Sequence, residues 1–181
     1  MLHYSCGAFN DSMSNGLYSF TNPAFVSFAG YSTAAVLKMF GIAAYTIGQR
    51  FRTKTFATPE DDVYKQLVSS LLGSESGLDG GSGARGRGRD CMNAVVERVR
   101  GNHLNDLENI IPFVLIGLFY VGTQPKYDCA LWHYRLFLLS RLVHTIAYQV
   151  PLPQPTRTLS WLIGYATTIS MALRVFKIII Y

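Results

Sequence analysis

Charged side chains are scarce in this sequence, and so are cysteines. Asp, Glu, Lys and Arg together make up 15% of the 181 residues, whereas 49% are hydrophobic. The three cysteines, Cys6, Cys91 and Cys129, form no Cys-x-x-Cys pair, so neither a disulfide framework nor a zinc site is indicated. The N-terminus has no basic region ahead of a short apolar core, and we therefore expect no cleaved signal peptide.

The hydrophobic residues are concentrated in four blocks rather than spread along the chain. Each block approaches the ~20 residues that a helix needs to cross a ~30 Å hydrocarbon core. The sequence therefore predicts an all-α integral membrane protein built as a four-helix bundle in one domain. The predicted spans are 23–49, 93–121, 128–149 and 157–178.

Positive charge is concentrated between the first two spans. The net charge of +5 would suggest nucleic acid binding in a soluble protein, but nine of the sixteen Lys and Arg lie between Arg50 and Arg100. By the positive-inside rule, the connection 50–92 is cytoplasmic and both termini lie on the other side. Its Gly/Arg-rich part, 73–90, is expected to form a flexible loop. We expect a phospholipid membrane as a partner, and no nucleic acid.

A polar segment, RVRGNHLNDLENIIP, leads directly into the second apolar block. On a helix, Arg98, Asn105 and Glu108 share one face, and their sequence of cation, amide and carboxylate suits a zwitterionic ligand. The alternative is that these side chains only pair with neighbouring helices. A metal site using His103, Asp106 and Glu108 is disfavoured because Glu108 is rotated away and no second His-carboxylate pair faces it.

The third span is unusual because it contains Arg135, Arg141 and His144. Arg141, His144 and Tyr148 share one face, which predicts an anion-accepting, water-accessible cavity between helices. Lys38, in the middle of the first span, should have an interhelical partner for the same reason.

The fourth span begins with Arg157 and Thr158, immediately after the Pro-rich connection VPLPQPT. A helix N-terminus carries partial positive charge, so these residues are placed to stabilise an anion formed during a reaction. The alternative is that Arg157 is an interfacial anchor.

The segments RVRGNHLNDLENIIPF and HYRLFLLSRLVHTIAYQVPLPQPTRTLSWLIGY resemble the membrane-associated eicosanoid and glutathione metabolism (MAPEG) family. The resemblance extends from about Tyr31 to the C-terminus. It implies a homotrimer of four-helix bundles in the endoplasmic reticulum membrane, and also in the mitochondrial outer membrane, with glutathione bound near the cytoplasmic side between adjacent subunits. The implied glutathione-binding residues are Arg50, Asn105, Glu108, Arg141, His144, Tyr148 and Arg157.

The resemblance implies attack of the glutathione thiolate on hydrophobic electrophiles from the bilayer, and reduction of lipid hydroperoxides as a second activity. The catalytic role falls to Arg157, helped by Thr158 or Tyr148. Two alternatives are a prostaglandin E synthase-like isomerase, which also has a hydroxyl beside the arginine, and a non-catalytic lipid-binding member. One departure from the family pattern is that Gly101 and Asn102 replace Arg and Ala.

Overall fold

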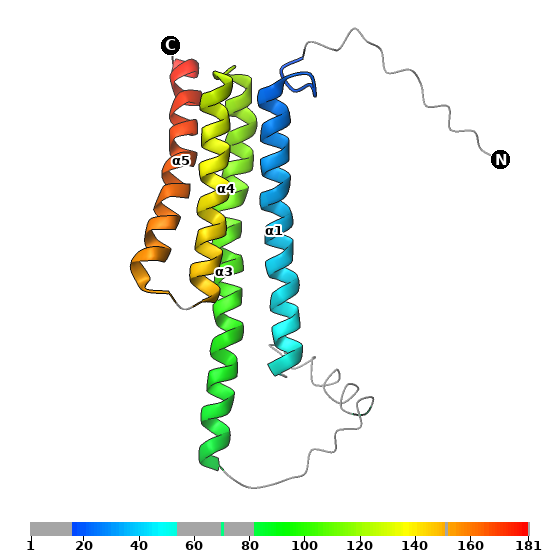
Figure 1. Ribbon diagram of the computed structural model, residues 1–181, viewed down its shortest axis with the longest axis vertical. Helices are drawn as coiled ribbons and strands as arrows, with labels where there is room; N and C mark the ends of the chain where they lie inside the picture. The colour runs from blue at the N-terminus through cyan, green and yellow to red at the C-terminus, as the bar shows by residue number, and fades with distance from the viewer. Residues whose placement is uncertain (1–15, 54–69, 71–81, 151, 181) are drawn as a thin grey trace, which may run out of the picture.

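The described part of the protein forms a bundle of four long helices (Figure 1). The computed structural model describes residues 16–53, 70, 82–150 and 152–180. The four helices confirm the all-α, four-helix bundle predicted from the sequence. The helices are α1 (Pro23–Thr53), α3 (Ser82–Gly122), α4 (Tyr127–Gln149) and α5 (Gln154–Ile180).

Local sequence signals fix the start and the end of α1. The side chain of Asn22 accepts a hydrogen bond from the backbone N–H of Ala24 at 3.0 Å, as expected of a residue that caps a helix N-terminus. Pro23 follows as the first helical residue, where its missing N–H costs nothing. Arg50 and Arg52 lie in the last turn, where cations interact favourably with the helix dipole.

The second predicted span starts earlier than expected. α3 begins at Ser82 and has 41 residues, whereas the sequence led us to expect a start at residue 93. The part of the Gly/Arg-rich stretch from Ser82 onward is therefore helical, not loop. Once a helix has formed, each added residue gains a backbone hydrogen bond at little cost, and the Ala and Arg residues here favour helix. Residues 73–81 of the predicted loop lie outside the described residues. In Figure 1, α3 extends beyond the ends of the other helices.

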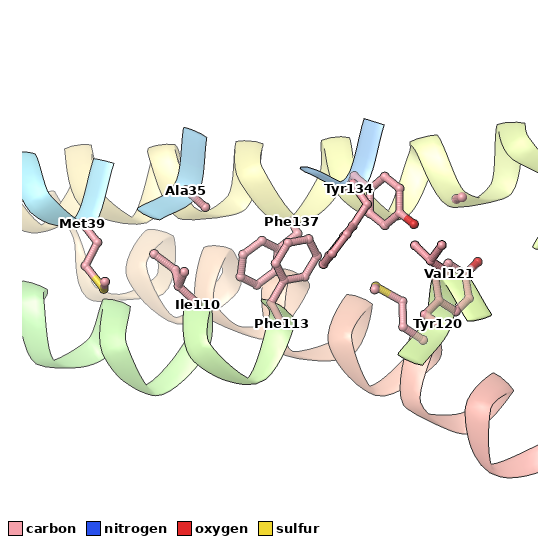
Figure 2. Packing of buried hydrophobic residues seen from close by; sticks show 11 residues of the cluster. Ala35, Met39, Ile110, Phe113, Tyr120, Val121, Tyr134 and Phe137 are labelled. Carbon is pink, nitrogen blue, oxygen red and sulfur yellow. The ribbon is translucent and has the colours of Figure 1, made fainter. Parts of the chain in front are cut away.

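The core lies mainly between α1, α3 and α4, with Met171 contributed by α5, and five of its eleven buried residues are aromatic (Figure 2). The rings of Phe113 and Phe137 are stacked with their centroids 3.7 Å apart, and Tyr134 meets Phe113 edge-on. Gly117 of α3 faces the ring of Phe28 so closely that a Cβ atom at this position would overlap it. The glycine thus allows α1 to approach α3.

Three helical segments in the described part of the chain are long and apolar enough to cross a membrane: Pro23–Thr53, Ala94–Gly122 and Gln154–Ile180. The predicted span 128–149 coincides with α4, whose hydropathy is lowered by Arg135, Arg141 and two histidines. α4 nevertheless packs against α1, α3 and α5. Large apolar side chains such as Leu37, Phe119 and Leu173 cover the outside of the bundle, as expected of a lipid-facing surface.

Candidate functional site

A carboxylate is completely buried at the junction of three helices. Asp106 of α3 receives hydrogen bonds from Nζ of Lys38 on α1, which lies 2.6 Å from each carboxylate oxygen. Arg141 of α4 pairs with the same carboxylate from the other side, with Nη2 2.9 Å from Oδ1. The prediction that Lys38 has an interhelical partner is confirmed.

Arg141 connects this ion cluster to the adjacent residue of α3. Its Nε lies 3.3 Å from Oδ1 of Asp106, and its Nη2 also donates to Oδ1 of Asn105 at 2.7 Å. The guanidinium is fully buried, so it acts within the protein and does not face the solvent. The ion pair with Asp106 and the hydrogen bond to Asn105 together fix the planar guanidinium in one orientation.

Asn105 lies at the edge of a pocket of about 230 Å³ between α3, α4 and α5. Among the described residues, those that line the pocket supply one guanidinium and several hydrogen-bonding groups but no carboxylate. Such a lining favours an anionic ligand. Its lining residues are Asn105, His144, Tyr148, Arg157, Thr158 and Trp161.

The cation of the pocket, Arg157, is positioned by α4. Its guanidinium carbon lies 4.5 Å from the centroid of the Tyr148 ring, within the range of a cation–π interaction. Nδ1 of His144 lies 3.1 Å from the backbone carbonyl oxygen of Arg157 and 3.3 Å from Oγ of Ser160. These contacts attach the first turn of α5 to α4. The first-turn position of Arg157 adds the partial charge of the helix N-terminus to that of the guanidinium.

Tyr148 also reaches α3, where it meets a glycine. A Cβ atom placed on Gly101 would lie 3.0 Å from the hydroxyl oxygen of Tyr148, closer than ordinary van der Waals contact. The absence of a side chain at Gly101 therefore gives Tyr148 its place between α3 and Arg157.

The structure brings five of the predicted site residues into this one pocket: Asn105, His144, Tyr148, Arg157 and Thr158. Arg141 contributes indirectly, through its bond to Asn105. Arg50 and Glu108 do not line the pocket, and Glu108 is exposed on α3.

Two residues escaped the sequence analysis of the site. Trp161 lines the pocket one helical turn beyond Arg157 and stacks on Tyr165, with ring centroids 5.1 Å apart. Its spacing of four from Arg157 is the signal that would have found it.

The second residue is Asp106, which the sequence suggested only as a metal ligand. In the described part of the chain no group of three His, Cys, Asp or Glu side chains is placed to hold a metal ion, and Asp106 is engaged by two cations instead.

Comparison with known proteins supports the resemblance to the MAPEG family over most of the chain. The chain is 42% identical over 160 residues to microsomal glutathione S-transferase 1 of Sus scrofa, covering 88% of this chain and 94% of that protein. It is 42% identical over 162 residues to the Homo sapiens protein of the same name, covering 87% and 92%. Prostaglandin E synthase of Equus caballus is 36% identical over 144 residues, covering 80% and 82%. The MAPEG family pattern matches residues 28–177, and the chain therefore belongs to the MAPEG family.

Proposed function

We propose that this protein is a membrane-bound glutathione transferase that conjugates glutathione to hydrophobic electrophiles. The observation that supports this most directly is the pocket in which Arg157, at the start of α5, is placed over Tyr148. Glutathione carries two carboxylates and a thiol that becomes an anion, and the pocket offers a cation and hydrogen-bond donors to such groups. The relatives named microsomal glutathione S-transferase 1 add support over 88% of the chain.

Arg157 is proposed to stabilise the thiolate of glutathione. A free thiol has a pKa of about 8.5, so it is mostly protonated at neutral pH. A neighbouring guanidinium and a helix N-terminus both favour the thiolate and lower the pKa of the thiol. Each unit by which the pKa falls corresponds to about 1.4 kcal/mol in favour of the thiolate. The hydroxyl group of Tyr148 is proposed to assist by donating a hydrogen bond to the sulfur. The hydroxyl of Thr158 donates to the backbone oxygen of Gln154 at 3.3 Å, and it is proposed to turn to the sulfur when glutathione binds.

In the conjugation step, the thiolate sulfur forms a bond to an electrophilic carbon, and the leaving group departs with the bonding electron pair. The thiol proton passes to water. The apolar face of Trp161, stacked on Tyr165, is a suitable wall for an electrophile that arrives from the bilayer. The same thiolate is proposed to reduce a lipid hydroperoxide to the corresponding alcohol. A second glutathione then reacts to form glutathione disulfide, and water is released.

A homotrimer is proposed to complete the glutathione site. Arg50 and Glu108 are outside the pocket of a single chain, and Glu108 is exposed one turn from Asn105. In the proposed assembly, Arg50 of an adjacent subunit binds a carboxylate of glutathione while Glu108 binds its ammonium group. We propose the endoplasmic reticulum membrane as the location, with the mitochondrial outer membrane as a second one.

Stopped-flow absorbance at the thiolate band tests the proposal. Detergent-solubilised protein mixed with glutathione at neutral pH should give a thiolate signal that Arg157→Ala abolishes. Arg174→Ala is the matched control, because this arginine of α5 bonds Thr123, outside the pocket, and it should retain the signal. A wild-type protein that gives no thiolate signal, and no glutathione binding by calorimetry, would favour the non-catalytic lipid-binding alternative.

A prostaglandin E synthase-like isomerase is the second candidate. Thr158 supports it by placing a hydroxyl in the pocket beside Arg157, and the relative named prostaglandin E synthase is 36% identical. An isomerase regenerates glutathione in every cycle, whereas a transferase consumes it. Incubation with a prostaglandin endoperoxide, with glutathione measured before and after, separates the two activities.

A further inference from the structure

The buried cluster of Lys38, Asp106 and Arg141 lies directly behind the pocket. Asp106 and Arg141 are fully buried, and neither lines the pocket. Arg141 nevertheless donates through the same Nη2 atom to Asp106 and to the pocket residue Asn105, at 2.9 Å and 2.7 Å. The position of Asp106 therefore influences the position of Asn105 in the pocket through the planar guanidinium of Arg141.

The contact with Arg141 determines which way the amide of Asn105 faces. An arginine side chain has only donors, so the atom of Asn105 that lies 2.7 Å from Nη2 must be the acceptor Oδ1. Nδ2 lies in the same plane as Oδ1 and points to the opposite side of the Cβ–Cγ bond, away from Arg141. Nδ2 has no hydrogen-bond partner among residues 16–53, 70, 82–150 and 152–180 of the chain. Asn105 lines the pocket, and this amino group is the donor that its side chain can offer to a ligand there.

Asp106 fixes the guanidinium that sets this orientation. It accepts from Nε and Nη2 of Arg141 with the same oxygen, Oδ1, which holds one edge of the guanidinium plane. Lys38 contacts both oxygens of the carboxylate from α1, so the carboxylate itself cannot rotate freely. The three side chains therefore form a support that reaches from α1 through α3 to α4.

We infer that Asp106 is a positioning residue of the glutathione site, which acts through Arg141 to present the side-chain amino group of Asn105 to the ligand. This inference rests on the proposed function. The group of glutathione that Asn105 binds is then an acceptor, such as a carboxylate, and cannot be its ammonium group. Lys38 anchors Asp106 and has the same indirect role.

Calorimetry of glutathione binding to the full-length protein in detergent tests the inference with Asn105→Asp. The aspartate keeps an acceptor for Arg141 but replaces the donor that faces the pocket with an oxygen. We expect the Kd for glutathione to rise by about 10- to 100-fold, the range expected for losing a hydrogen bond to a charged group, while the thermal unfolding temperature stays within a few degrees. Wild-type affinity in this variant would mean that Asn105 only holds Arg141, and would overturn the inference.

Arg141→Lys tests the link through the guanidinium. A lysine retains the ion pair with Asp106, but a single ammonium on a flexible stem does not reproduce the fixed fork that reaches both Asp106 and Asn105. The KM for glutathione should rise by about tenfold, the scale of one such hydrogen bond, with kcat at saturating glutathione within about twofold. An unchanged KM, or a loss confined to kcat, contradicts a positioning role in binding.

Asp106→Asn should raise the KM for glutathione as Arg141→Lys does. Glu97→Gln is the control, because in the described part of the chain Glu97 makes only an exposed ion pair with Arg100. If Asp106→Asn does not fold, Arg141→Lys and Asn105→Asp still decide the question. The two hypotheses fail differently. Wild-type protein that does not bind glutathione refutes the proposed function, whereas normal binding by Asn105→Asp refutes only this inference.

Discussion

The guanidinium of Arg157 lies over the ring of Tyr148, 4.5 Å from the ring centroid. Tyr148 in turn rests on Gly101 of α3, so the cation of α5 is positioned by a contact that passes through α4 to α3. Nδ1 of His144 holds the backbone of the same arginine. The side chain and the main chain of Arg157 are therefore both fixed by α4, which suits the proposed role of this residue in stabilising a thiolate at one place in the pocket.

The aromatic ring of Tyr148, rather than its hydroxyl, should be what positions Arg157. Tyr148→Leu removes a cation–π interaction of about 0.5–2 kcal/mol and should weaken the thiolate signal of bound glutathione by about 2- to 30-fold, the corresponding range of equilibrium constants. Tyr148→Phe keeps the ring and should retain more of the signal than the leucine variant does. Equal losses in the two variants would assign the whole effect to the hydroxyl and would contradict a positioning role for the ring.

Removal of the buried carboxylate should cost more stability than removal of either cation beside it. Asp106→Ala leaves the positive charges of Lys38 and Arg141 facing each other without compensation, and breaking a buried pair in this way costs about 3–5 kcal/mol. Lys38→Met leaves Asp106 paired with Arg141, so it should cost less. Thermal unfolding in detergent, followed by circular dichroism, measures both. Equal unfolding temperatures would contradict this prediction, because they would show that the two cations left without a carboxylate cost no additional stability.

The approach of α1 to α3 should depend on Gly117. A Cβ atom at this position would overlap the ring of Phe28, and overpacking of this kind costs about 1–3 kcal/mol. Gly117→Ala should therefore lower the thermal unfolding temperature. Gly41→Ala is the matched control, because a Cβ atom there meets nothing within 4 Å. This control should be neutral or stabilising, since alanine favours helix over glycine by about 1 kcal/mol.

The sequence predicted the helices well because the signals for them were local. The apolar blocks predicted the helices, and the three- and four-residue spacing of Arg141, His144 and Tyr148 predicted that they share a face. The role of Asp106 was missed because it depends on Lys38 and Arg141, which are 68 and 35 residues away in the sequence. No periodicity within one helix reports such a contact. The start of α3 was missed because glycine-rich composition outweighed helix continuity in the prediction.

Arg141 is a second residue whose contacts could not be predicted from the sequence. Its residue type predicted an anion-accepting cavity, and the family resemblance implied that it contributes to the glutathione site. The structure buries its guanidinium completely and gives it Asp106 and Asn105 as acceptors. Only the packing of α3 against α4 determines these acceptors, and a direct contact of Arg141 with glutathione stays a prediction.

Gly101 should control the affinity for glutathione through Tyr148. A Cβ atom at Gly101 would lie 3.0 Å from the Tyr148 hydroxyl oxygen, so Gly101→Ala should displace the ring and, with it, Arg157. We expect a rise in the KM for glutathione of about 3- to 10-fold, because moving the ring forfeits much of a cation–π interaction. Removing the hydroxyl should relieve the contact. The double variant Gly101→Ala/Tyr148→Phe should therefore bind glutathione better than Gly101→Ala alone, as steady-state kinetics on all four proteins would show. Additive losses in the double variant would mean that the two side chains do not compete for this space, and would contradict this prediction.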